Sequence, residues 1–289
     1  MRTGASRRTG AMFLIIIAVA VALAFMAIRI RNKNIDPHAG QVCINVGFGM
    51  VWITPIEGVD VNPFGDEDFQ RVDGQLCYVG EEYEVRRGVD VSEHQHGIEW
   101  DKVAASGIDF AFIRVGYRGY TKGGLVEDAY FHQNMQGALA NGIDVGVYIY
   151  SQAINVQEAL EEAQFVMERI KNYNVTLPVV FDWEIDNNEA RTYGLDNAIL
   201  NDCAVAFCET VKNAGYEPNV YFNRSFGYYR FDLARLNDYS FWVAVPGEFP
   251  DFYYAGEFWQ YSFTEIVPGI HTETDMNLWF IPKPEEPAA

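Results

Sequence analysis

The chain has 289 residues and a formal net charge of −19 at pH 7, with 49% hydrophobic and 15% aromatic residues. That length allows one large domain or two smaller ones, and the apolar content can fill a sizeable core. Six of the 21 basic residues lie within positions 1–33, so the remainder carries a charge of about −25. Such a surface repels a phosphate backbone and the sequence shows no basic stripe, so nucleic acid is excluded as the expected partner.

The N-terminal segment carries a membrane signal. Residues 11–28 are an uninterrupted apolar run with basic residues on both sides, and a helix needs about 20 residues to cross a bilayer core. We therefore predict a cytoplasmic tail at residues 1–10 and a membrane span at residues 11–30. A cleaved signal peptide is the alternative, because Ala22–Ala24 forms an A-x-A pattern near the end of the run. Both interpretations place the rest of the chain outside the cell, either on a single-pass membrane protein or as a secreted one.

Two short segments separate the apolar run from the body of the chain. Residues 31–41 are polar, contain Pro37 and are typical of a linker. Residues 42–86 hold short β-like runs that Gly and Pro interrupt. This is too little chain to bury a reliable core of its own. We therefore expect residues 42–86 to form a small β extension that packs on the next domain.

From Arg87 onward, strand and helix signals alternate. We assign residues 87–282 to one domain, followed by a tail at residues 283–289. The expected strands are residues 88–91, 108–115, 145–150, 177–182, 218–222, 241–245, 257–261 and 276–280. Amphipathic patterns predict helices at residues 126–140, 156–172, 197–214 and 227–236. The alternation favours parallel strands with right-handed crossovers. The predicted fold class is α/β, an irregular (β/α) barrel with helices missing in the last third. An open doubly wound sheet is the alternative.

Acidic residues at strand ends are the candidates for chemistry, because barrel active sites lie at the C-terminal ends of strands. Asp182 and Glu184 close one strand two positions apart, so their carboxyl groups share a face. Two carboxyl groups this close do not ionise independently, and the raised pKa of one supplies a proton donor near neutral pH. Glycosidic cleavage needs such a donor beside a second carboxylate. Asp90 and Asp275 flank the first and last strands, where a helix cap or a turn would also explain them.

Other kinds of site have weaker support. His94 and His96 suggest a metal, but they lack a carboxylate–histidine set at ligand spacing. The Gly-x-Ser-x-Gly pattern of a serine nucleophile is absent. We therefore expect no metal and no cofactor.

Several segments, in order, resemble glycoside hydrolase family 25, the Chalaropsis-type lysozymes. They are Gly88–Gln95, Ile98–Trp100, Gly107–Gly116, Asp144–Tyr150, Phe181–Glu184, Trp259–Ser262 and Asp275–Asn277. The resemblance covers residues 87 to about 280. It implies a TIM-like barrel enzyme that cleaves the β-1,4 bond between N-acetylmuramic acid and N-acetylglucosamine in peptidoglycan strands.

Carried over residue by residue, the resemblance implies that Glu184 is the general acid. Asp182 would position the 2-acetamido group of the substrate or stabilise the transition state, and Asp90 and Asp275 would complete the acidic cluster. The resemblance also implies four groove residues, each of which would serve equally in barrel packing: Tyr117, Tyr148, Tyr150 and Trp259.

Two questions stay open at this level. Separate acid and base carboxylates would invert the anomeric centre, whereas attack by the 2-acetamido oxygen would retain its configuration. A non-catalytic glycan-binding or envelope structural protein on the same fold is the alternative to an enzyme. The four acidic residues weigh against that alternative, because binding alone needs no elevated acid.

Overall fold

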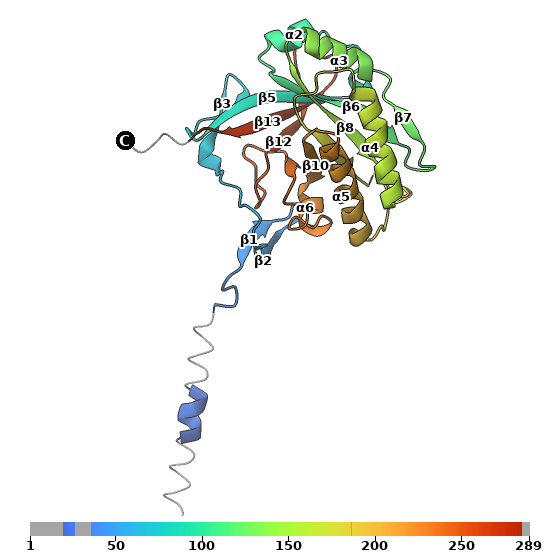
Figure 1. The fold of residues 1–289 in the computed structure, drawn as a ribbon. Helices are drawn as coiled ribbons and strands as arrows, with labels where there is room; N and C mark the ends of the chain where they lie inside the picture. The colour runs from blue at the N-terminus through green and yellow to red at the C-terminus, as the bar shows by residue number, and fades with distance from the viewer. Residues whose placement is uncertain (1–19, 27–35, 186, 285–289) are drawn as a thin grey trace, which may run out of the picture. The chain divides into compact units, whose positions relative to one another are not determined.

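Figure 1 shows the computed structural model, which describes residues 20–26, 36–185 and 187–284. The chain divides into two units, residues 1–43 with 52–55 and residues 44–51 with 56–289. The predicted cytoplasmic tail at residues 1–10 and most of the membrane span predicted at residues 11–30 lie outside the described residues. Within the described part of the chain, no helix is both long and apolar enough to cross a membrane.

Residues 36–185 and 187–284 contain a closed barrel of eight strands. Around the barrel these are β5 (Tyr83–Val91), β6 (Phe110–Arg118), β8 (Asp144–Ser151), β9 (Val179–Trp183), β10 (Pro218–Asn223), β11 (Ser240–Ala244), β12 (Phe258–Glu265) and β13 (Thr274–Pro282). All eight predicted strands are confirmed. The parallel pairing of β5 with β6 closes the sheet, so the open doubly wound alternative was wrong.

The last strand runs against the others. β13 pairs antiparallel with both β12 and β5, whereas the remaining pairs around the barrel are parallel. A parallel connection needs a crossover of about a dozen residues or more, and only residues 266–273 separate β12 from β13. The short connection therefore forces β13 to return antiparallel. The expectation of parallel strands throughout was wrong for β13.

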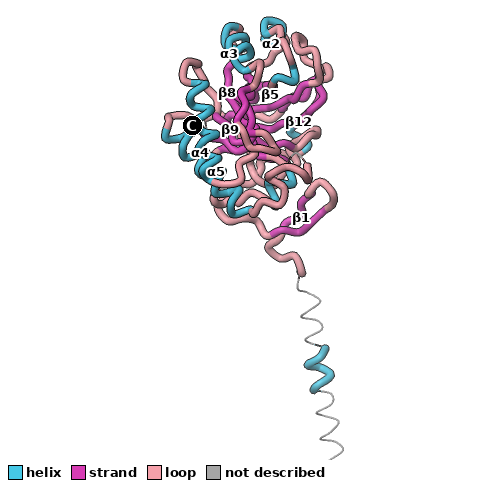
Figure 2. The backbone as a smooth tube through the Cα atoms, turned by 90° about the vertical axis from the view of Figure 1, so that its right-hand side faces the viewer, coloured by secondary structure: helices cyan, strands magenta, loops and turns pink. Residues whose placement is uncertain are grey.

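Helices cover the outside of the first two thirds of the barrel (Figure 1). They are α2 (Trp100–Ala105), α3 (Phe131–Ala140), α4 (Val156–Ile170), α5 (Asn197–Asn213) and α6 (Arg224–Tyr229). Figure 2 shows α4 and α5 side by side against the strands. Between Arg230 and residue 284 the structure has no further helix, so the helix predicted to residue 236 ends early and the predicted lack of helices after residue 236 is confirmed.

Two predicted helices begin elsewhere than expected. The helix expected from residue 126 begins at Phe131, because β7 (Leu125–Glu127) pairs antiparallel with β6 instead. The helix expected at residues 227–236 is α6, which begins at Arg224. Asn223 sets that start, since its side-chain oxygen accepts a hydrogen bond from the backbone N–H of Phe226.

The predicted extension divides into several parts. β1 (Val42–Asn45) and β2 (Met50–Ile53) form one two-stranded sheet, and β3 (Phe69–Val72) and β4 (Gln75–Tyr78) form another. β5 begins at residue 83 and pairs with β13 along its length, so the last residues of the predicted extension belong to the barrel. The expected boundary before residue 87 therefore falls inside a strand.

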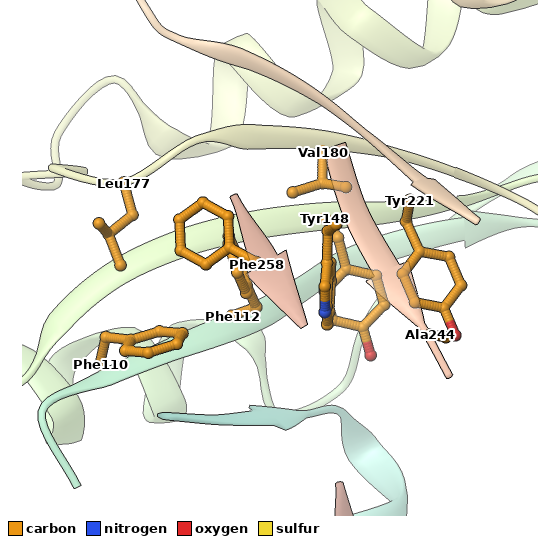
Figure 3. Close-up of a cluster of buried hydrophobic side chains, with 9 residues drawn as sticks. Phe110, Phe112, Tyr148, Leu177, Val180, Tyr221, Ala244 and Phe258 are labelled. Atoms are coloured by element: carbon orange, nitrogen blue, oxygen red, sulfur yellow. The ribbon is translucent and has the colours of Figure 1, made fainter. Parts of the chain in front are cut away.

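Alternate side chains of the strands fill the barrel interior, because successive side chains on a strand point to opposite faces. Figure 3 shows the cluster of buried side chains inside the barrel. In this cluster Trp242 stacks on Phe112 with ring centroids 4.5 Å apart. Its buried members are Phe110, Phe112, Tyr148, Leu177, Val180, Tyr221, Trp242, Ala244 and Phe258. Tyr148, Tyr221 and Trp242 also line the pocket described next. They form its floor and separate it from the rest of the core.

Candidate active site

A pocket of about 190 Å³ opens where the C-terminal ends of the parallel strands meet. Its lining is rich in acidic, amide and aromatic side chains. The lining residues are Asp90, Ser92, His94, Gln95, Arg114, Tyr148, Tyr150, Asp182, Glu184, Tyr221, Trp242, Gln260 and Asp275. The structure thus brings the four predicted carboxyl groups together.

Strand β9 places Asp182 and Glu184 side by side. Asp182 is 5% exposed and Glu184 is half-buried at the mouth. Trp183, between them, turns to the outside and donates from Nε1 to the carbonyl oxygen of Ala153 at 2.9 Å. Burial raises the pKa of Asp182 well above its ordinary value, and the charge of Glu184 raises it further. The two carboxyl groups therefore titrate as a coupled pair in which Asp182 favours its protonated form.

The backbone of Glu184 is held from the neighbouring strand. Gln152 follows β8 and donates from Nε2 to the carbonyl oxygen of Glu184 at 2.7 Å. The hydroxyl of Thr192 donates both to Oε1 of Gln152 at 2.9 Å and to the same carbonyl oxygen at 3.3 Å. Two of these contacts are on the main chain of Glu184, and the third holds Gln152 in place. They fix the position of the Glu184 backbone, and the carboxyl group of Glu184 lines the pocket.

Asp90 and Asp275 face each other across the antiparallel pair of β5 and β13. Oδ2 of Asp90 accepts hydrogen bonds from Nδ2 of Asn277 at 2.8 Å and from Nε2 of Gln260 at 2.9 Å. Burial raises the pKa of Asp90 to about 6 despite these donors. Burial and the charge of Asp90 raise the pKa of Asp275 to about 9. In this second pair Asp275 is therefore the member that holds its proton more tightly, and Asp90 is the more acidic one.

One cation borders the acidic cluster. Arg114 on β6 is 8% exposed and lies over the ring of Tyr117, with its guanidinium carbon 5.3 Å from the ring centroid. It donates to Asp128 at 2.8 Å and to Glu93 at 3.1 Å. Two carboxylates beyond the pocket therefore hold Arg114. Its charge lowers the pKa of Asp182 less than burial raises it.

The structure separates the four predicted groove aromatics into two groups. Tyr148 and Tyr150 line the pocket, and Tyr117 and Trp259 do not. Trp259 is 1% exposed, donates from Nε1 to the carbonyl oxygen of Val245 at 2.8 Å and contacts Phe69 edge-on. Its side chain points to the outside of the barrel, because side chains alternate along a strand and the neighbouring Phe258 and Gln260 point inward. For Trp259 the structure supports the packing alternative, whereas Tyr117 is half-buried and pairs with Tyr150 at the rim of the pocket, so its role stays a prediction.

Two residues that support the site were missed in the sequence: Gln260, which lines the pocket, and Asn277, which donates to Asp90 from behind it. Both lie in segments that carry the family resemblance, Trp259–Ser262 and Asp275–Asn277. Alternation along β12 from buried Phe258 would have placed Gln260 inside the barrel. His94 lines the pocket, but among the described residues no group of three or more His, Cys, Asp or Glu side chains could hold a metal ion.

Carboxyl groups with raised pKa values in the mouth of a β/α barrel are typical of enzymes that use general acid catalysis. The chain matches Glycosyl hydrolases family 25 over residues 89–270, which is more than half of its length, and it belongs to that family. It is 29% identical over 208 residues to lysozyme M1 of Streptomyces globisporus, which is 66% of each chain.

Solved structures show the same fold. The modular autolysin LytC of Streptococcus pneumoniae matches with a TM-score of 0.62 and 29% identity, over 73% of this chain and 52% of that one. A bacterial lysozyme from Streptomyces coelicolor matches with a TM-score of 0.50 and 25% identity, over 66% of this chain and 90% of that one. The present chain therefore spans about half the length of LytC and about two thirds of lysozyme M1.

Proposed function

We propose that this protein is a peptidoglycan hydrolase that cleaves the β-1,4 bond between N-acetylmuramic acid and N-acetylglucosamine. The observation that carries the proposal is the mouth of the family 25 barrel, where four carboxyl groups line one pocket and burial raises the pKa of Asp90, Asp182 and Asp275. Two similar proteins are called lysozymes, and LytC has been solved with a synthetic peptidoglycan ligand.

Glu184 is the proposed general acid. It is the more exposed member of its pair, so it can reach the glycosidic oxygen from the pocket wall. The proton of the pair passes to that oxygen as the bond to the leaving sugar breaks. Asp90, ionised at pH 7 and buried in the opposite wall, places a negative charge beside the developing oxocarbenium ion.

Asp182 is the proposed partner of the 2-acetamido group. Its Oδ1 is buried and has no hydrogen-bond partner in the part of the chain that the structure describes. A substrate N–H that donates to this oxygen would satisfy it. That bond would also lower the pKa of Asp182 and move the proton of the pair to Glu184. Asp182 and Glu184 contact each other directly, whereas an inverting pair needs room for water, about 6.5–9.5 Å. We therefore favour retention through the acetamido oxygen.

The bond that is cut can be identified from the products. We expect the full-length protein to release fragments from purified peptidoglycan that carry N-acetylmuramic acid at their new reducing ends. Borohydride reduction followed by mass spectrometry would identify that sugar. Reducing-end N-acetylglucosamine would keep a glycosidase and reject the proposed bond. An absence of new reducing ends, with the glycan still bound, would favour the non-catalytic glycan-binding protein.

We also propose that residues 11–30 anchor the protein as a single-pass membrane protein with its catalytic domain outside the cell. The support is the apolar run alone. Intact mass and N-terminal sequencing of the protein from the producing cell test this proposal. An anchored protein retains Met1 or Arg2 and sediments with membranes. An N-terminus immediately after Ala24 would instead establish a cleaved signal peptide and a secreted enzyme.

A further inference from the structure

We infer that Gln260 is a positioning residue, which bridges the carboxyl groups of Asp90 and Asp275 and holds them as one pair that faces the substrate. The inference rests on the proposed function, because it assigns the pair a part in the same reaction. No catalytic step is assigned to Gln260 itself. Its amide acts on the two carboxyl groups from the wall of the barrel.

The contacts of Gln260 account for its whole side chain. It is 2% exposed, and its Nε2 donates to Oδ2 of Asp90 at 2.9 Å and to Oδ2 of Asp275 at 3.0 Å. An amide nitrogen has two protons, so each carboxyl group receives one. Its Oε1 accepts a hydrogen bond from the hydroxyl of Tyr221 at 2.8 Å, which determines which end of the amide carries the donors.

The three strands involved make this arrangement rigid. β13 lies between β5 and β12, so Gln260 on β12 reaches across β13 to Asp90 on β5. Asn277, on β13, donates a second hydrogen bond to Asp90 and accepts one from Nε1 of Trp242 at 2.7 Å. The oxygen Oδ2 of Asp90 therefore faces two fixed amide donors, and that arrangement stabilises its charged form.

The choice of an amide at this position has an electrostatic reason. A carboxylate in place of Gln260 would offer no donor and would add a further charge to a buried acidic cluster. An apolar side chain would leave Asp90 with one donor fewer and Tyr221 without its acceptor. The titratable and charged groups that face the pair from the surrounding elements are Asp182, Glu184, Arg114, Tyr148, Tyr150, Tyr221 and His94.

Loss of the amide donors should change the pH dependence of the reaction in one direction. The hydrogen bond from Gln260 lowers the pKa of Asp90, so its removal raises that pKa. Activity that needs ionised Asp90 is lost as the pH falls through this pKa, so the acidic limb of the pH profile should move to higher pH. We expect a shift on the order of one pH unit, because a hydrogen bond to a charged group contributes that much.

Two variants of the full-length protein test the inference. Gln260→Glu retains an acceptor for Tyr221 and leaves at most one donor, the O–H of a protonated carboxyl group, whereas Gln260→Met removes both donors and the acceptor at similar volume. We expect kcat on peptidoglycan to fall about 10- to 100-fold in both, with KM changed less than about 2-fold. The matched control is Asn219→Asp, the same amide-to-carboxylate change at a buried residue that contacts Ser240 near the start of β10. It should retain kcat and the pH profile.

A measurement on the wild-type protein covers the case in which the variants do not fold. The carboxyl ¹³C resonances of Asp90 and Asp275, followed from pH 4 to pH 10, should show one proton on the pair at pH 7. Two ionised groups at pH 7, or variants with wild-type kcat and pH profile, would overturn the inference. If wild-type protein released no reducing ends, the proposed function would fail, and the same NMR titration of Gln260→Met beside wild type would still decide whether Gln260 holds the pair.

Discussion

Replacement of Glu184 by Gln should abolish nearly all release of reducing ends from peptidoglycan while the protein stays folded. The amide is isosteric but has no acidic proton, so the glycosidic oxygen would leave without protonation. General acid catalysis contributes about 10²- to 10⁴-fold in rate, and we expect a fall in kcat within that range. The measurement is the initial rate of reducing-end formation, with thermal unfolding recorded in parallel.

The stability of the variant separates a catalytic role from a structural one. Ionised Glu184 raises the pKa of Asp182 by its charge, so removal of that charge should leave the folded protein at least as stable as the wild type. Glu168→Gln is the matched control, because Glu168 is exposed on the outer helix α4. A Glu184→Gln protein with more than half of the wild-type rate would show that another group is the acid.

The largest effect on stability should come from Arg118. Its side chain is 4% exposed and donates from Nε to Oε1 of Glu162 at 2.7 Å, between β6 and α4. It also donates to the carbonyl oxygens of Gly123 and Glu158. Arg118→Met would leave the fully buried carboxylate of Glu162 with only the hydroxyl of Ser151, at 2.6 Å. Removal of one partner of a buried ion pair costs about 3–5 kcal/mol, which urea denaturation at pH 8 would measure.

The same variant should be less damaging in acid. Burial already raises the pKa of Glu162 to about 7, and loss of the guanidinium raises it further. A raised pKa in the folded state gives stability that is present below the ordinary value and lost as the pH rises through the raised one. The stability difference between Arg118→Met and wild type should therefore be smaller at pH 5 than at pH 8.

An exposed ion pair provides the control for Arg118. Arg235 lies 2.7 Å from Asp202, but the two side chains are 42% and 49% exposed. Arg235→Met should change the free energy of unfolding by less than about 1 kcal/mol. A double variant, Arg118→Met with Glu162→Met, should recover much of the lost stability because no unpaired charge remains. Equal losses for Arg118→Met and Arg235→Met would contradict the account.

Local pattern determined most of the barrel. Each of the eight strands was predicted because a buried strand is a short apolar run between turn signals, and that property belongs to the segment itself. The pair Asp182 and Glu184 was predictable for the same reason, since side chains two apart on a strand share a face whatever the fold. The lack of helices after residue 236 was also predictable, because no helical hydrophobic period follows that residue.

Tertiary structure decided what depends on which strands become neighbours. The antiparallel direction of β13 follows from its pairing with β5, which lies almost two hundred residues earlier in the chain. That pairing alone brings Asp275 beside Asp90, and the order of β12 and β13 brings Gln260 to both. The raised pKa values follow in turn, because a pKa depends on burial and on charges that only the folded chain brings close.

The aromatic residues show the same division. The sequence marked Tyr148, Tyr150 and Trp259 as sugar-binding or packing residues and left the choice open. Side-chain direction on a strand is local, but which face turns to the pocket depends on how the sheet closes. In the closed barrel, the side chains of Tyr148 and Tyr150 point inward and line the pocket, whereas Trp259 points outward and contacts Phe69. The sequence by itself determined the strands and the acidic residues of this protein, and the closed sheet decided which side chains meet.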